Sequence, residues 1–245
     1  MTRLRAGFIA VSLGFAAQSA LAADMPGGYG GGYGVPVLRA PSAIVAANWD
    51  GFYVGGHLGG GFTSGSYTLN NGVFTENYNF DPSGFIGGVQ GGLQATWGHW
   101  LLGVEGTYTW TGLSQTAVSS IAPNNLATMD VKYLGAVSAR LGFTLDRLMI
   151  YAKGGWAFAR TYTFDRNTVS GIGAETWAWD NGYVVGTGLE YQFAPGWVGG
   201  LAFDYYHFTP TRNFAIGATN GYISNGEVGI YSLTAKVSYL FNWWQ

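Results

Sequence analysis

The chain has 245 residues, enough for one domain with a substantial core, and its 41 glycines and 17% aromatic residues favour strands and turns over long helices. Charged residues make up only 10% of the chain, against roughly 25% in a soluble globular protein, which is too few to cover a soluble exterior. The formal net charge of −2 gives no sign of nucleic-acid binding, and the absence of cysteine excludes disulfides and thiolate metal sites.

The first 22 residues are typical of a secretory signal peptide. Arg3 and Arg5 form a positively charged start, and residues 8–17 form an apolar stretch too short to span a bilayer. The Ala-Leu-Ala motif at 20–22 fits a cleavage site. We therefore expect residues 1–22 to be removed on export.

Residues 23–48 are rich in Gly, Tyr and Pro and have no readable period, which predicts a flexible periplasmic segment. From residue 49 to residue 245 the turn signals are nearly evenly spaced. They fall at Gly98-His99, at Asp146-Arg147 and at residues 194–196. They divide this part of the chain into four units, each with room for two strands and a longer loop.

Four such units predict eight antiparallel strands, with three short turns at one end and four long loops at the other. Both termini then lie at the end with the short turns. The expected strands are 51–67, 84–97, 100–114, 128–145, 148–164, 177–193, 197–209 and 229–242. The expected long loops, rich in Asn, Gly, Ser, Thr and Pro, are 68–83, 115–127, 165–176 and 210–228.

Large apolar residues alternate with small or polar ones in each expected strand, as in the stretch from Tyr183 to Phe193, where Glu190 opposes the bulky set. In a soluble lipocalin-like barrel the bulky set would face inward, and very few charges would have to solvate the exterior. In a membrane barrel the bulky set faces lipid, and the polar set fills the lumen. Closure would also satisfy every backbone hydrogen bond in hydrocarbon. We therefore predict an all-β, eight-stranded antiparallel transmembrane barrel of the outer-membrane, up-and-down type.

The inward positions carry charged residues at similar expected heights. Six of them, whose charges sum to zero, form a predicted lumen charge layer: Glu105, Arg140, Lys153, Glu190, Asp204 and Lys236. Other polar residues expected in the lumen are His57, Gln90, Gln94 and Lys132. Because buried charges in a narrow lumen must be paired, we expect a salt-bridged plug. The alternative is that the same charges line a conducting path.

Aromatic residues collect near both ends of the expected strands, as in the girdles at the two surfaces of a membrane. The predicted interface aromatics are Trp97, Trp100, Trp110, Trp177, Trp197 and Phe241. Arg160 breaks the pattern because it takes a lipid-facing position near the outer rim. There it could snorkel or meet a lipid phosphate.

Two stretches, "NWDGFYVGGHLGGGF" at 48–62 and "LTAKVSYLF" at 233–241, carry a family resemblance. Together with the signal and the short turns, they resemble the alphaproteobacterial outer-membrane porin family, the small immunogenic-protein-like barrels of the OmpA type, over about residues 1–242. The resemblance implies a surface-exposed, antigenic protein of the Gram-negative cell envelope that contributes to envelope integrity and host contact. It also implies contact with outer-membrane lipid and lipopolysaccharide, and insertion by the barrel-assembly machinery.

In that family the chain usually ends on an aromatic residue that the barrel-assembly machinery reads as the insertion signal. Either Trp243 continues the outward-facing alternation and the last strand runs on, or Tyr239 and Phe241 are the signal and a tail follows. Here four further residues, 242–245, follow Phe241, and this departure puts the efficiency of insertion in question. Some relatives are reported to bind haemin or to form small pores.

Catalysis by a lipid-modifying barrel would need a Ser-His-acid set at the rim. The chain has three histidines: His57 in the expected lumen, His99 in a short turn, and His207 near the outer rim, where it could assist haem binding. No metal-ligand spacing is present. We expect neither an enzyme nor a resident cofactor or metal, but a structural barrel that presents surface loops. A narrow pore for small solutes or ions, and capture of a ligand such as haemin or of a host surface by the loops, are the alternatives.

Overall fold

The computed structural model describes residues 47–70, 75–118, 125–167, 173–209, 212–216 and 219–242. The expected signal peptide and most of the expected periplasmic segment lie outside these residues and stay predictions. Among the described residues, no helix is long and apolar enough to cross a bilayer.

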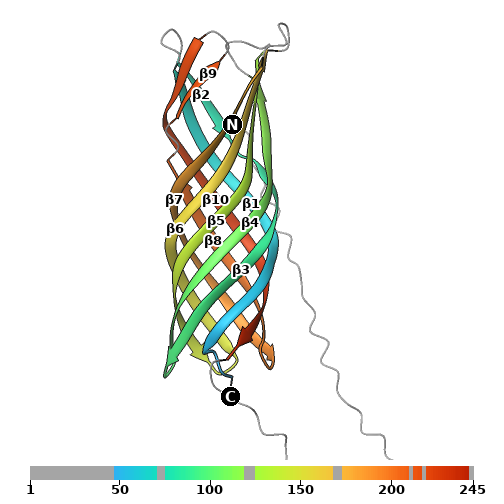
Figure 1. Cartoon of the computed structure of the whole chain (residues 1–245), viewed down its shortest axis with the longest axis vertical. Helices are drawn as coiled ribbons and strands as arrows, with labels where there is room; N and C mark the ends of the chain where they lie inside the picture. The colour runs from blue at the N-terminus through green and yellow to red at the C-terminus, as the bar shows by residue number, and fades with distance from the viewer. Residues whose placement is uncertain are drawn as a thin grey trace, which may run out of the picture. The chain divides into compact units, whose positions relative to one another are not determined.

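Eight long strands form a closed antiparallel barrel (Figure 1). They are β1 (Gly51–Asn70), β3 (Ser83–Trp97), β4 (Trp100–Val118), β5 (Asn125–Leu145), β6 (Leu148–Asn167), β7 (Gly173–Ala194), β8 (Trp197–Phe208) and β10 (Thr219–Phe241). Each strand pairs with the next, and β1 also pairs with β10, with Phe52 opposite Phe241 and His57 opposite Lys236. This closure leaves no free edge in the barrel wall and confirms the predicted fold class.

The three short turns lie where the sequence predicts them, at 98–99, 146–147 and 195–196. Gly98 and Gly196 have φ angles of 63° and 73°, which glycine adopts without strain, and Asp146 has a φ of 53°, a conformation that aspartate tolerates well. All three turns lie at one end of the barrel, called here the short-turn end. The opposite end is the loop end.

The strands extend further toward the loop end than expected. Two segments assigned to loops form short strands, β2 (Thr75–Phe80) and β9 (Arg212–Ile216), and these pair with the outer parts of β1 and β10. The prediction of loops at 68–83 and 210–228 was therefore wrong in these parts. The loop prediction rested on composition. Strand pairing, however, uses backbone hydrogen bonds, which can continue beyond the apolar band of the barrel whatever the side chains are.

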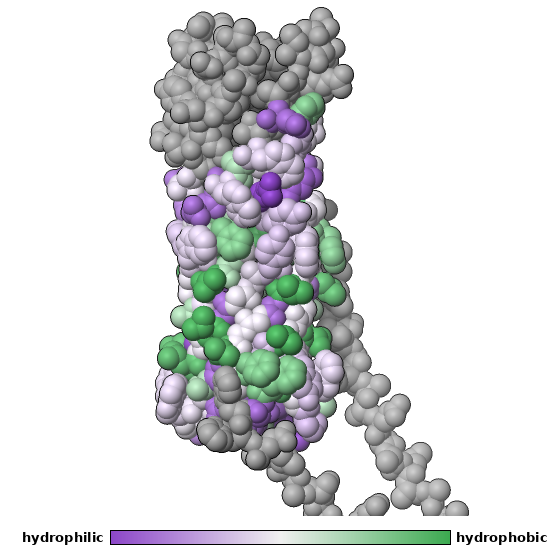
Figure 2. Space-filling view, viewed as in Figure 1, coloured by the Kyte–Doolittle hydropathy of each residue, from purple (hydrophilic) through white to green (hydrophobic). Residues whose placement is uncertain are grey.

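The two faces of the wall differ as predicted. Apolar side chains such as Phe85, Leu93 and Leu233 are more than half exposed on the outside, while Glu105, Arg140 and Ser232 are buried inside. Figure 2 shows hydrophobic residues gathered in a band across the lower half of the visible face, with hydrophilic residues above them. An apolar exterior around a polar interior is the arrangement that a barrel in lipid requires.

Candidate functional site in the barrel lumen

The structure brings together all six residues of the predicted charge layer. Glu105 on β4 lies at its centre and meets three cations. Its Oε1 lies 3.0 Å from Lys153 Nζ, and its Oε2 lies 2.8 Å from Lys236 Nζ and 3.3 Å from an Arg140 Nη. The side chain of Glu105 is fully buried, so each of these contacts is shielded from water.

Two further carboxylates complete the layer. Arg140 donates from its other terminal nitrogen to Glu190 Oε1 at 2.7 Å, and Lys236 lies 3.6 Å from the same oxygen. Lys153 lies 3.1 Å from Asp204 Oδ1. Every cation thus contacts two carboxylates, which offsets the cost of removing the charges from water.

The register of the strands gives these long side chains their room. Arg140 on β5 and Lys153 on β6 lie directly opposite each other. Arg140 contacts Glu105 on the neighbouring strand β4 and Glu190 on β7, and Lys153 contacts carboxylates on β4 and β8, neither of which adjoins β6. Gly186 lies opposite both Lys153 and Asp204, and Gly200 lies opposite Glu190 and Lys236. A Cβ at Gly186 would stand 2.1 Å from Asp204 Oδ1. Glycine at these positions therefore leaves the space that the charged groups occupy.

Two tyrosines belong to the same network, although the sequence did not single them out. Tyr53 donates to Glu105 Oε2 at 2.9 Å and accepts a short hydrogen bond from Arg140. The ring of Tyr151 lies under the Arg140 guanidinium, 4.0 Å from Cζ. Both residues occupy inward positions, so strict alternation within β1 and β6 would have found them.

An apolar layer closes the lumen at the short-turn end, and the sequence prediction missed it. It consists of Trp49, Tyr53, Leu101, Met149, Tyr151, Val198 and Leu240. Trp49 precedes β1, is only 3% exposed and donates from its indole nitrogen to the Asp146 carbonyl at 2.9 Å. Gln94 donates to the Trp49 carbonyl at 2.8 Å. Trp49, in the described residues 47–50 before β1, is thus tied across this mouth of the barrel.

A second apolar cluster lies on the loop-end side of the charges. It consists of Leu113, Val131, Leu134, Ala136, Ala157, Ala159, Val184, Tyr206, Phe208, Val228 and Ile230. Leu113, Leu134 and Ile230 are almost fully buried. The charge layer therefore lies between two apolar layers.

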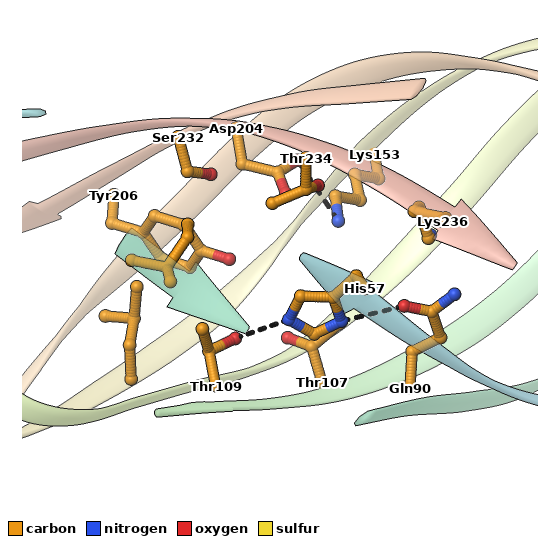
Figure 3. Close-up of a pocket in the computed structure, with 12 residues that line it drawn as sticks. His57, Gln90, Thr107, Thr109, Lys153, Asp204, Tyr206, Ser232, Thr234 and Lys236 are labelled. Carbon is orange, nitrogen blue, oxygen red and sulfur yellow. Dashed lines mark hydrogen bonds and ion pairs between the residues drawn. The ribbon is translucent and has the colours of Figure 1, made fainter. Parts of the chain in front are cut away.

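A small polar cavity lies between the charges and the loop-end cluster (Figure 3). His57 lies on its wall, with Nδ1 2.8 Å from Gln90 Oε1 and Nε2 2.9 Å from Thr109 Oγ1. Gln90 also donates to Ser238 Oγ at 2.9 Å. The cavity leaves about 10 Å³ for the centre of a water molecule, which is room for about one water.

One predicted lumen residue was assigned wrongly. The ammonium of Lys132 pairs with Asp130 at 2.9 Å, its side chain is 42% exposed, and it takes no part in the charge layer. The register of β5 shifts between Val131 and Tyr133, so Lys132 lies at an irregularity in the ladder. Simple alternation along the strand fails there.

The six predicted interface aromatics lie on the outside of the barrel wall and are between 40% and 64% exposed. Phe241 stacks on Phe52 across the closing strand pair, with ring centroids 4.5 Å apart, and Tyr239 is also turned outward. Trp243 and the end of the tail lie outside the described residues. The role of Tyr239 and Phe241 in insertion stays a prediction.

The remaining histidines are engaged by neighbours. His99 lies in the first short turn with Nδ1 3.1 Å from the Thr144 carbonyl oxygen, and His207 contacts Tyr183 and Tyr205 on the outer face. Among the side chains that the structure describes, no group of three or more His, Cys, Asp or Glu residues could hold a metal ion. The ion pairs of the lumen neutralise one another's charge.

Comparison with solved structures gives similar folds. The outer membrane protease OmpT of Escherichia coli is 9% identical with a TM-score of 0.51, and OprG of Pseudomonas aeruginosa is 10% identical with the same score. Both matches cover 78% of this chain and 97% of the other. Neisserial surface protein A (NspA) is 17% identical, with a TM-score of 0.42 and coverage of 78% and 97%.

No curated protein matches the sequence significantly. At these identities the matches to OmpT and OprG show the fold alone. The family model described as outer membrane protein beta-barrel domain matches residues 8–241, nearly the whole chain. The chain therefore belongs to the family of outer membrane protein β-barrel domains.

Proposed function

We propose that this outer-membrane barrel is a closed scaffold without enzymatic activity. Its lumen is sealed, and its function lies in stabilising the envelope and in presenting the loop end. One observation carries the proposal: a fully paired charge layer lies between two apolar layers. Water and ions crossing such a lumen would have to separate buried ion pairs, at a cost of several kcal/mol for each unpaired charge.

The proposal includes an orientation. In outer-membrane barrels the short turns face the periplasm and the longer loops face outward, and the strand ends here divide in the same way. Both termini of the barrel are then periplasmic. Outer-membrane lipid and lipopolysaccharide surround the wall, the barrel-assembly machinery inserts it, and the loops are available to a host surface. The resemblance to the alphaproteobacterial porin family supports the same role.

Catalysis is not proposed. His207, the described histidine nearest the loop end, contacts tyrosine side chains, with Nδ1 3.3 Å from the Tyr205 hydroxyl. The likeness to the protease OmpT, at 9% identity, concerns the fold alone. Haemin capture through His207 is likewise not favoured by these contacts.

Solute efflux from vesicles tests the closed lumen. We expect the native barrel, refolded into liposomes, to retain entrapped ions and glucose as protein-free liposomes do. Arg140→Ala, which removes the cation between Glu105 and Glu190, should produce a leak because two buried carboxylates lose a partner.

Leu189→Ala is the matched control, because Leu189 lies on the lipid-facing side of β7 and should leave the vesicles tight. Rapid efflux through the native protein would overturn the proposal. It would favour the second candidate, a narrow channel for small solutes or ions. The observation that favours a channel is the polar cavity beside the charges, lined by His57, Lys153 and Lys236.

A further inference from the structure

Arg160 projects from the outward face of β6, among side chains that would meet lipid. Its guanidinium lies over two tryptophans of the neighbouring strand β7, with Cζ 4.8 Å from the ring centroid of Trp177 and 5.4 Å from that of Trp179. In the strand register Arg160 is opposite Trp179 on one side and Tyr133 on the other. Two strands, β6 and β7, therefore hold this cation in one place on the outer wall.

The guanidinium of Arg160 has N–H donors that no described residue accepts from. Within the described part of the chain, Arg160 makes no hydrogen bond or ion pair, and its Nε is buried without a partner. Glu175, on the same face, accepts instead from the Tyr162 hydroxyl at 2.9 Å. Contacts with ring faces use the charge of an arginine but leave its N–H donors in the guanidinium plane free.

The height of Arg160 matches the level of lipid headgroups. Outward side chains of β6 from Ile150 to Phe158 are mainly apolar or small, and polar ones begin at Arg160 and Tyr162. From Leu148 to Phe158 the strand advances about 25 Å along the barrel axis, at about 3.3 Å per residue and a tilt of about 40°. That distance equals the height of the apolar band of an outer-membrane barrel, so Arg160 lies at its upper border.

We infer that Arg160, held by Trp177 and Trp179, binds a phosphate group of an outer-leaflet glycolipid of the lipid A type. A planar guanidinium with free donors suits a phosphate because it can donate two parallel hydrogen bonds to it. The tryptophans fix the guanidinium in advance, which lowers the entropy lost on binding. The identity of the lipid rests on the proposed orientation, in which the loop end faces the outer leaflet.

Native mass spectrometry of the refolded full chain in detergent micelles tests the site. The probes are bisphosphorylated lipid A and the same lipid with both phosphates removed. We expect Arg160→Gln to weaken binding of the phosphorylated lipid about tenfold, as loss of a charged hydrogen-bond donor should. Arg147→Gln, in a short turn at the other end of the barrel, is the matched control and should bind as the native protein does.

A second variant, Arg160→Lys, keeps the charge and loses the fork of donors, so its affinity should fall between those of the native protein and Arg160→Gln. Equal binding by Arg160→Gln and the native protein would overturn the site, as would equal binding of the two lipids. Displacement of the lipid by millimolar inorganic phosphate would also overturn it, because the site would then take the free ion. This assay involves no conductance and no membrane orientation. A barrel that leaks but binds the lipid would overturn only the sealed lumen. A barrel that is tight but does not bind the lipid would overturn only the lipid site.

Discussion

Arg140 and Arg160 are both stacked on aromatic rings, yet they lie on opposite faces of the same barrel wall. Arg140 is 1% exposed, lies 4.0 Å from the centroid of Tyr151 and is paired with Glu105 and Glu190. Arg160 lies 4.8 Å from the centroid of Trp177, and no described carboxylate neutralises it. Inside the barrel the protein must supply the counter-charge itself. On the outside, at the border of the apolar band, the membrane can supply it.

Of the variants that test this comparison, Glu105→Gln should lower the free energy of unfolding most. It removes the charge that meets three cations, leaves the layer with a net charge of +1, and should lower the free energy of unfolding by about 3–5 kcal/mol. Urea unfolding in lipid vesicles measures the change. Glu227→Gln, at an exposed position on β10, should stay within about 0.5 kcal/mol of the native protein. Equal effects of the two variants would mean that the lumen network adds nothing.

Gly186→Ala should lower the free energy of unfolding by an intermediate amount, through a steric clash and without a change of charge. The new methyl group would stand 2.1 Å from Asp204 Oδ1, so the carboxylate must move away from Lys153. We expect a loss of about 1–3 kcal/mol in the same unfolding measurement. Gly106→Ala, on the outward face of β4, would meet nothing closer than 3.9 Å and should be nearly neutral. A neutral Gly186→Ala would show that the network tolerates displacement.

Arg160→Ala should have the smallest effect on stability, less than about 1 kcal/mol, because it removes only contacts with ring faces. Arg140→Ala, measured alongside it, should cost several times more, because it leaves two buried carboxylates short of a partner. If Arg160→Ala and Arg140→Ala lower the free energy of unfolding equally, the proposed difference between the inner and outer faces does not exist.

Alternation and turn spacing were enough to predict the barrel and its charged residues. Period-two patterning is unambiguous where one face meets lipid, so Glu190 and Lys236 could be placed inside without a structure. The same rule failed at Lys132, because an irregularity of register cannot be read from hydrophobicity. The separate prediction of loops from composition failed for β2 and β9, which form strands by backbone pairing with β1 and β10.

The apolar layers were missed for a different reason. Trp49 lies before β1, and Leu101 and Leu240 lie at strand ends, where bulky residues were expected to face outward. Which pairs form within the charge layer could not be predicted either. Strand tilt offsets residues that are equally far from their turns, so the sequence could not predict that Lys153 meets both Glu105 and Asp204.

Single-channel recording of the refolded native protein in a planar bilayer is the most direct test of the sealed lumen. The account predicts a silent membrane for the native protein, because its buried ion pairs stay closed between two apolar layers. Discrete conductance steps, changed in size or frequency by Arg140→Ala, would contradict it. They would show that the charge layer lines a pore.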